Sequence, residues 1–260
     1  MNKSLQQSID FANRESYLDE LFQVYPTIPD GIREINQTLW NKVEQAFNQK
    51  DDIALIKSLL KMDIFPIKDS YVAYLKRDKT SIEKNPNTIE RLAGRIYELG
   101  LDKIYEKCSE PKETNRQIGP MFKSWINSGA LGMLPVELHR FMSSNENAIL
   151  NGSDKVMMDF AKGYLNYHHN KGLDFVARFN GKYVIGEAKF LSDFGGHQNA
   201  QFNDAISTIE VEGVNAVKIA ILDGVLYIPG NNKMYKAITH EYKDYNIMSA
   251  LVLREFLYQL

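Results

Sequence analysis

The sequence predicts an α/β protein in which helices flank a mixed sheet and the N-terminal half is mostly helical. The first observation is a hairpin signal, because two apolar runs rich in β-forming residues flank Asn180-Gly181. The second is a helical pattern over residues 198–209, followed by an apolar run of strand length at 217–222. With the second hairpin strand, these segments form a βαβ unit whose two strands are parallel. A hairpin joined to a parallel strand makes the sheet mixed.

The helices of the first half follow from apolar residues at helical spacing and from the residues that end each run. Such a pattern extends from residue 4 to residue 25, where Pro26 and Pro29 stop it. Residues 85–88 supply capping side chains for a later helix, which Gly100 ends. The further helices expected in this half cover residues 32–49, 53–61, 89–99 and 102–108.

The segments around the hairpin are expected to be loops and short helices. Residues 110–125 are polar at first and amphipathic after Pro120, which favours a loop that leads into a helix. Loops are expected at 143–154 and 192–196, and a helix is expected at 156–167. A second hairpin strand is expected at 225–228. The second hairpin is predicted because Asp223-Gly224 is a turn signal between apolar runs.

Composition places the 260-residue chain among ordinary globular proteins, with 44% hydrophobic and 25% charged residues. Cys108 is the single cysteine, so neither a disulfide framework nor a cysteine zinc site is expected. No apolar stretch approaches the ~20 residues of a membrane span, and the N-terminus lacks a signal-peptide pattern. We therefore expect a cytoplasmic protein with no membrane partner. A net charge of −2 argues only weakly against a nucleic-acid partner, because a local basic surface can coexist with it.

Three charged residues on the predicted hairpin are the best candidates for a functional site. If Asn180 and Gly181 form the loop, counting outward along both strands places Asp174 directly opposite Glu187. Lys189 lies two residues beyond Glu187 and projects from the same face. Opposed carboxylates repel each other, so we expect a cation between them. Oxygen ligands from carboxylates, a backbone carbonyl and water suit Mg²⁺ better than zinc.

The spacing of these residues also resembles a known signature. Asp174, a twelve-residue gap and then Glu187-Ala188-Lys189 look like the motif of the PD-(D/E)xK nucleases, the superfamily that holds most type II restriction endonucleases. Leu173 stands where that motif often has proline, which leaves the metal ligands unaffected. The chain resembles sequence-specific type II restriction endonucleases, in particular the group around the Tsp-type and Tde-type enzymes, in four further stretches: residues 70–75, 85–89, 114–125 and 186–198.

The resemblance implies a type II restriction endonuclease that hydrolyses double-stranded DNA with Mg²⁺. Asp174 and Glu187 would hold the metal with the carbonyl of Ala188, and Lys189 would position the attacking water. The products would carry 5′-phosphate and 3′-hydroxyl ends. A homodimer is implied because both strands of a palindrome are cut, and a cognate DNA methyltransferase is implied as functional partner. We expect one restriction-endonuclease-like domain over 1–260, with a helical part at 1–110 and the catalytic core at 111–260.

Two polar segments are candidates for contacts with DNA. Their side chains both donate and accept hydrogen bonds, which is the chemistry that reads base edges or grips phosphates. The candidates are His197, Gln198, Asn199 and Gln201, together with Arg116 and Gln117. The alternative is a solvated helix start for the first segment and an ordinary surface loop for the second.

The remaining candidates are weaker, and two rival functions stay open. Glu90 or Glu137 would supply an additional acidic residue to the site, unless each is a surface glutamate. His168-His169 has no further ligand at zinc spacing, and Cys108 is most simply a buried thiol. The rivals are a structure-selective repair or junction nuclease of the same superfamily and a non-enzymatic α/β DNA-binding module.

Overall fold

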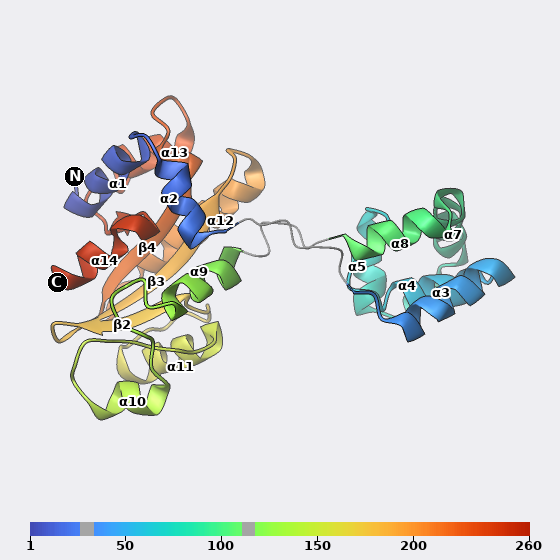
Figure 1. The fold of residues 1–260 in the computed structure, drawn as a ribbon, viewed down its shortest axis with the longest axis horizontal. Coiled ribbons are helices and arrows are strands. Elements are labelled where there is room, and N and C mark those ends of the chain that lie inside the picture. Colours follow the sequence, from blue (N-terminus) through green and yellow to red (C-terminus); the bar gives the residue numbers. More distant parts are fainter. Residues whose placement is uncertain (27–33, 111–117) are drawn as a thin grey trace. The chain divides into compact units, whose positions relative to one another are not determined.

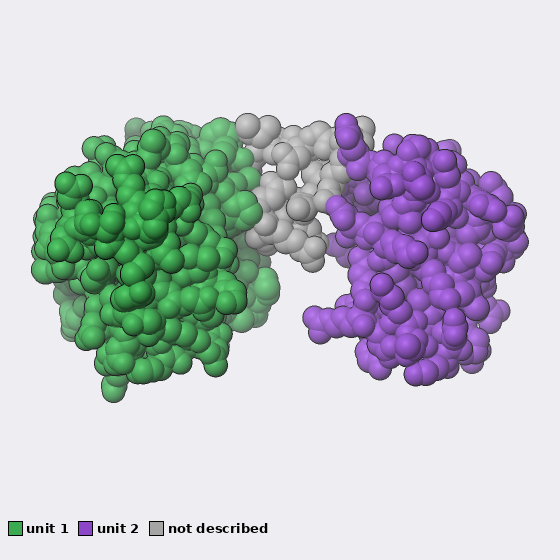
Figure 2. All heavy atoms as spheres, turned by 90° about the horizontal axis from the view of Figure 1, so that it is seen from below, with its two compact units in different colours: residues 1–27, 113–260 green, residues 28–112 purple. Residues whose placement is uncertain are grey.

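A computed structural model describes residues 1–26, 34–110 and 118–260. The chain forms two compact units, which Figures 1 and 2 show separately. Unit 1 comprises residues 1–27 and 113–260, and unit 2 comprises residues 28–112. The helical segment expected over 1–110 is therefore divided, because its first two helices pack in unit 1. None of the helices in the described residues is long and apolar enough to cross a bilayer.

Unit 1 is built on a five-stranded mixed sheet with strand order β1-β2-β3-β4-β5. The strands are β1 (Ala148–Ile149), β2 (Phe175–Phe179), β3 (Lys182–Leu191), β4 (Val217–Gly224) and β5 (Ile247–Met248). The first three pair antiparallel, and β4 pairs parallel with both β3 and β5. Asn180 and Gly181 have φ of 50° and 77°, as a tight hairpin turn requires, and Phe179 pairs with Lys182. The mixed α/β fold and the hairpin register are confirmed.

Helices cover both faces of this sheet (Figure 1). On the face from which Val176 and Ile185 project lie α10 (Leu138–Ser143) and α11 (Asp154–Tyr164), which share an apolar core with those residues. The helix of the predicted crossover, α12 (Gly196–Glu210), connects β3 to β4. The second core packs helices against Ala177 and Phe179, which project from the opposite face. The helices that contribute to this core are α1 (Lys3–Ala12), α2 (Tyr17–Val24), α9 (Ile118–Asn127), α12, α13 (Lys233–Lys236) and α14 (Ala250–Tyr258).

Several predictions about elements of unit 1 were wrong. The helix expected over 4–25 is interrupted, because the polar residues 13–16 offer no apolar side and Ser16 adopts a left-handed φ of 73°. Residues 225–228 form no hairpin strand, since a 3₁₀ turn covers Val225–Tyr227. A Cβ at Gly224 would lie 2.1 Å from the carbonyl oxygen of Leu191, so this glycine permits close approach of β3. The loop expected at 143–154 contains β1.

Unit 2 is entirely helical within its described residues. Its helices are α3 (Gln37–Gln49), α4 (Asp52–Leu59), α5 (Ser70–Arg77), α6 (Ser81–Lys84), α7 (Pro86–Leu99) and α8 (Leu101–Ser109). Asn36, Asp51 and Asp69 accept hydrogen bonds from backbone N–H groups at three helix starts. The core gathers apolar side chains such as Trp40, Leu55 and Leu92. Three of the four helices predicted here are confirmed within a few residues. The helix expected over 32–49 begins only at Gln37, and residues 32 and 33 lie outside the described part of the chain. Neither α5 nor α6 was anticipated.

Candidate active site

The hairpin register brings Asp174 and Glu187 together at the start of β2. Phe175 pairs with Gly186, so the next residues outward along the two sides of the hairpin are Asp174 and Glu187. The backbone N–H of Asp174 donates to the carbonyl of Gly186 over 3.1 Å. Its carboxylate Oδ2 accepts from the backbone N–H of Ala188 over 3.0 Å. Asp174 therefore precedes β2 but is held against β3.

Lys189 joins the two carboxylates, as the alternation of side chains along β3 predicted. Its ammonium makes an ion pair with Glu187 Oε1 and lies 3.7 Å from Asp174 Oδ2. Lys189 and Glu187 project from the same face as Ile185 because they are two residues apart on one strand. The three residues singled out in the sequence thus meet in one place.

Two further charged residues complete this group. Lys171 Nζ lies 3.5 Å from Glu187 Oε1 and 3.0 Å from Asp204 Oδ1. Asp204, on α12, has its Oδ2 3.6 Å from Lys189 Nζ. We call Asp174, Glu187, Lys189, Lys171 and Asp204 the charged cluster.

Sequence reasoning missed Lys171 and Asp204, because strand alternation says nothing about a residue before the strand or on a helix. One signal for Asp204 was present. Asp204 is next to Ala205, an apolar residue of the predicted crossover helix, and that helix packs against the sheet.

Burial gives the charged cluster unusual electrostatics. The Glu187 side chain is only 4% exposed, and burial, with the charge of Asp174, raises its pKa to about 7 against the opposing effect of Lys189. Burial alone would lower the pKa of Lys189, but the carboxylates of Glu187, Asp174 and Asp204 outweigh it and raise that pKa. Within the described residues, Glu187 Oε2 is buried and has no hydrogen-bond partner. A buried carboxylate oxygen left this way favours the approach of a cation or a donor.

The donor chemistry of the cluster fits Mg²⁺. Asp174 and Glu187 are hard oxygen ligands, and proteins often hold Mg²⁺ through one or two carboxylates, with water in the other positions. The described part of the chain holds no group of three or more His, Cys, Asp or Glu residues placed to bind a metal. A Mg²⁺ ion here would take the unpartnered oxygen of Glu187 as a ligand.

The segment after β3, which was predicted to contact DNA, forms the start of α12. His197 is exposed, and its Nε2 lies 3.1 Å from Nε2 of Gln201. Asn199 donates to the carbonyl of Phe194 over 3.1 Å. Gln198 is buried and donates to Ser192 Oγ over 3.1 Å, while its Oε1 has no partner among the described residues. The segment lies on the same helix as Asp204 of the charged cluster.

The other predicted site residues lie elsewhere or are not described. Arg116 and Gln117 fall outside the described residues. Glu90 is on α7 of unit 2. Glu137 precedes α10 and accepts a hydrogen bond from Asn151 over 2.8 Å. Asp204 is the carboxylate that accompanies Asp174 and Glu187 in the cluster.

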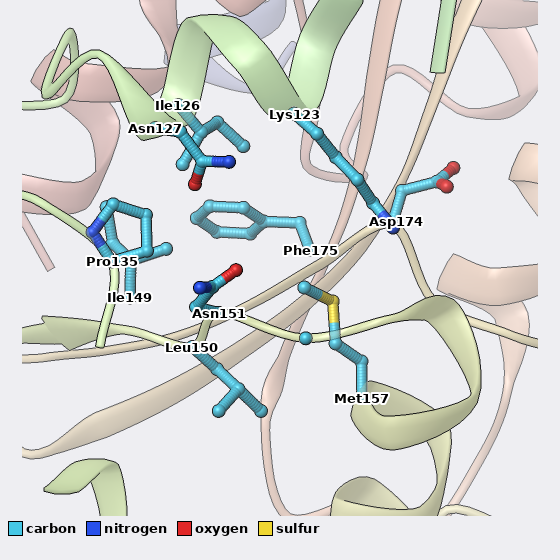
Figure 3. Close-up of a pocket in the computed structure, with 11 residues that line it drawn as sticks. Lys123, Ile126, Asn127, Pro135, Ile149, Leu150, Asn151, Met157, Asp174 and Phe175 are labelled. Carbon is cyan, nitrogen blue, oxygen red and sulfur yellow. The ribbon is translucent and has the colours of Figure 1, made fainter. Parts of the chain in front are cut away.

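A small pocket opens next to Asp174 (Figure 3). Phe175 and Met157 are among its apolar lining residues, and Lys123 stands at its rim. The Asp174 carboxylate points away from that lining, as expected from alternation with Phe175. Lys123, which lines the same pocket as Asp174, is paired with an acid: its Nζ donates to Asp154 Oδ1 over 2.6 Å.

One comparison with known proteins gives a match. A family model described as "Tsp45I type II restriction enzyme" matches residues 2–260, which covers both units and every residue of the charged cluster. No curated protein and no solved structure matches the chain.

Proposed function

Because the chain belongs to the Tsp45I family of type II restriction enzymes, we propose that the charged cluster is the active site at which it hydrolyses double-stranded DNA with Mg²⁺. One observation carries this assignment. Two opposed carboxylates meet on adjacent strands, one of them buried with an unpartnered oxygen, and a lysine pairs with both.

We also propose that unit 1 has the PD-(D/E)xK nuclease core. Three features of the fold support this. Asp174 stands at the start of one hairpin strand, Glu187-Ala188-Lys189 lies on the next, and α12 leads from that strand to a parallel partner.

Each residue of the cluster has a proposed role. Asp174 and Glu187 would hold Mg²⁺ together with the carbonyl of Ala188. When bound there, Mg²⁺ would supply positive charge that polarises the scissile phosphate and makes water more acidic. Lys189 holds the attacking water and offsets the charge that develops on the phosphate. Lys171, through its contacts with Glu187 and Asp204, is a positioning residue that keeps the Glu187 carboxylate oriented.

The partners follow from the reaction. Cutting two antiparallel strands at one palindromic site takes two equivalent active sites related by a two-fold axis, so we propose a homodimer. A cognate DNA methyltransferase would protect the cell's own sites. We propose that His197, Asn199 and Gln201 contact DNA, because they lie in the first turns of the helix that also carries Asp204. The predicted contacts from Arg116 and Gln117 remain part of the proposal.

Digestion of a plasmid of known sequence with the purified protein tests the proposed function. With Mg²⁺ we expect a fixed set of fragments with 5′-phosphate ends, and excess chelator should stop the reaction. Ca²⁺ should allow specific binding without turnover, since it accepts looser geometry and activates water less well. Cutting in excess chelator would contradict the metal assignment. Cleavage of branched DNA at any sequence would instead indicate a structure-selective nuclease.

A further inference from the structure

Unit 2 exposes two tyrosines on α5, next to basic side chains. Val72 and Leu75 turn toward the core of the unit, whereas Tyr71 and Tyr74 are each 62% exposed. Tyr74 and Arg77 are three residues apart and therefore neighbours on the solvent side of the helix. The apolar residues of α5 larger than alanine are thus buried, and what it presents to solvent is hydroxyl-bearing rings and cations.

The charge around α5 is positive. Residues 67–79 contain four basic side chains, Lys68, Lys76, Arg77 and Lys79, against the two carboxylates of Asp69 and Asp78.

Both of those carboxylates are already engaged. Asp69 is paired with Arg91 at 2.7 Å and with Arg95 at 3.7 Å, so two guanidinium groups face one acid. The Arg91 guanidinium also lies 5.5 Å from the centre of the Tyr71 ring. Asp78 accepts hydrogen bonds from the hydroxyls of Thr80 and Ser81.

A shallow hollow beside α5 adds room for a ligand. Lys68 and Lys76 stand in its wall, with Ile67, Val72 and Ala73 between them. Lys76 donates to the carbonyl of Met62 over 3.3 Å, which holds its ammonium at this place. Among the described residues, Lys68 and Arg77 make no ion pair, so their charges are free for a partner.

We propose that the α5 surface, made by Lys68, Tyr71, Tyr74, Lys76 and Arg77, binds the sugar–phosphate backbone of duplex DNA. Lysine, arginine and tyrosine hydroxyl groups are the donors that proteins use for phosphates. Protein–protein interfaces are depleted in lysine, whereas two lysines, Lys68 and Lys76, contribute to this surface. The inference rests on the proposed function, because that function makes duplex DNA the substrate.

Two sets of variants test the surface. Lys68→Ala with Arg77→Ala removes two charges, and Tyr71→Phe with Tyr74→Phe removes only the hydroxyls. Lys42→Ala with Lys103→Ala is the matched control, because both are exposed cations of unit 2 on α3 and α8. The probe is a short labelled duplex of plasmid sequence; where the wild-type protein cuts the plasmid, the duplex spans the cut site. Binding is titrated in chelator over a series of salt concentrations, so that no cutting occurs.

The charge variant should bind roughly tenfold more weakly, and its plot of log affinity against log salt should be shallower by about two. The affinity of the phenylalanine variant for the duplex should fall several-fold, and the control should keep the wild-type affinity and slope. Each variant should keep the wild-type thermal midpoint, because the changed side chains are exposed.

The outcomes separate this inference from the proposed function. Wild-type cutting with unchanged affinity and slope in the charge variant would overturn the α5 surface alone. Wild-type binding without any cutting would overturn the proposed function alone. Loss of affinity that follows dissociation of a dimer, seen by sedimentation, would assign the surface to a second copy of the chain and also overturn the inference.

Discussion

Glu187 shows at the scale of one residue why the charged cluster indicates a functional site and not a stabilising one. Its carboxylate is almost fully buried, with two ammonium groups on one oxygen and no partner for the other within the described residues. Burying a charge destabilises the folded state unless its pairing is complete. An incompletely paired buried acid is typical of a site that completes its pairing by binding a ligand.

The strongest residue-scale prediction concerns the three residues proposed for chemistry. Asp174→Asn, Glu187→Gln and Lys189→Ala should each lower the cleavage rate by about 10²-fold or more, because each removes a group that acts on the reacting phosphate or its metal. Plasmid cleavage time courses measure this, and a duplex titration should show that binding survives. Near-wild-type cutting by any of the three would remove that residue from the active site.

Lys171 should behave differently, because it acts through Glu187. Lys171→Ala removes a cation that competes with the metal for the carboxylates, so half-maximal cleavage should need less Mg²⁺. The maximal rate should fall roughly tenfold, since Glu187 loses a group that orients it. Cleavage rates across a Mg²⁺ series separate the two effects, and Lys171→Arg should restore both values. If neither value changes in Lys171→Ala, the lysine has no positioning role.

Asp223 provides a test of stability that is independent of DNA. This carboxylate accepts hydrogen bonds from Tyr25 at 3.0 Å, from the N–H of Ala250 at 3.2 Å, from Tyr17 at 3.4 Å and from Ser249. Burial raises its pKa to about 6, although the four donors oppose the rise. The folded state therefore holds the proton more tightly than the unfolded chain does. This contribution is fully present below about pH 4 and is lost as the pH rises through about 6.

Asp223→Asn removes that titration. The wild type should exceed the variant in unfolding free energy by more at about pH 4 than at about pH 7.5, and the change should be on the order of 3 kcal/mol. Denaturant titrations at the two pH values give the comparison. Asparagine also places an N–H₂ group among donors, so the variant should be less stable throughout. A difference that is the same at both pH values would show that ionisation of Asp223 is not coupled to folding.

At the scale of elements, the sequence predicted best where a local rule decides the geometry. Asn180-Gly181 determines the loop, the loop determines the register, and alternation then places Asp174, Glu187 and Lys189. The turn rule failed at Asp223-Gly224, because the glycine there permits the close approach of Leu191 and does not form a hairpin turn. That approach is a long-range contact, which no local pattern contains.

The start of α12 gives the element-scale prediction. Gln201→Ala and Asn199→Ala should each cost roughly 1–3 kcal/mol of binding at the cognate site and little on random DNA, if these amides read bases. Gln198→Ala should instead lower the thermal midpoint, because Gln198 is buried and bonded to Ser192. Titration of both duplexes at one salt concentration measures the first effect. Equal losses of affinity for the two DNAs would indicate phosphate contacts. No loss of affinity for either DNA would show that the segment is a solvated helix start.

At the scale of the whole molecule, the proposed dimer is the property to test. The protein on its cut-site duplex should sediment with twice the 29.8 kDa chain mass, plus that of the DNA, and both strands should be cut at equivalent positions. Mixing wild type with Glu187→Gln should yield nicked plasmid, because mixed dimers hold one working site. A monomer on DNA that cuts both strands would contradict the symmetric arrangement.

The division into units was the part least accessible to sequence. Residues 1–26 look like the start of a helical half, yet Ser8 Oγ accepts a hydrogen bond from the backbone N–H of Ser249, and Asn2 donates to Lys243 and Asn246. Helical periodicity shows that a helix has an apolar side but not which distant segment covers it. Lys171 and Asp204 escaped prediction for the same reason, since their meeting depends on the packing of α12.

The interruption of unit 1 by residues 28–112 has a consequence for the order of events on the ribosome. Unit 2 is encoded in one stretch and can fold as soon as that stretch has emerged, whereas α1 and α2 must wait for β4, β5 and α14. At typical translation speeds the wait is roughly 10–40 s. During this time the chain already displays α5, but Asp174 and Glu187 have no finished sheet to hold them. With the proposed α5 surface, a growing polypeptide would be able to bind DNA before it is able to cut it.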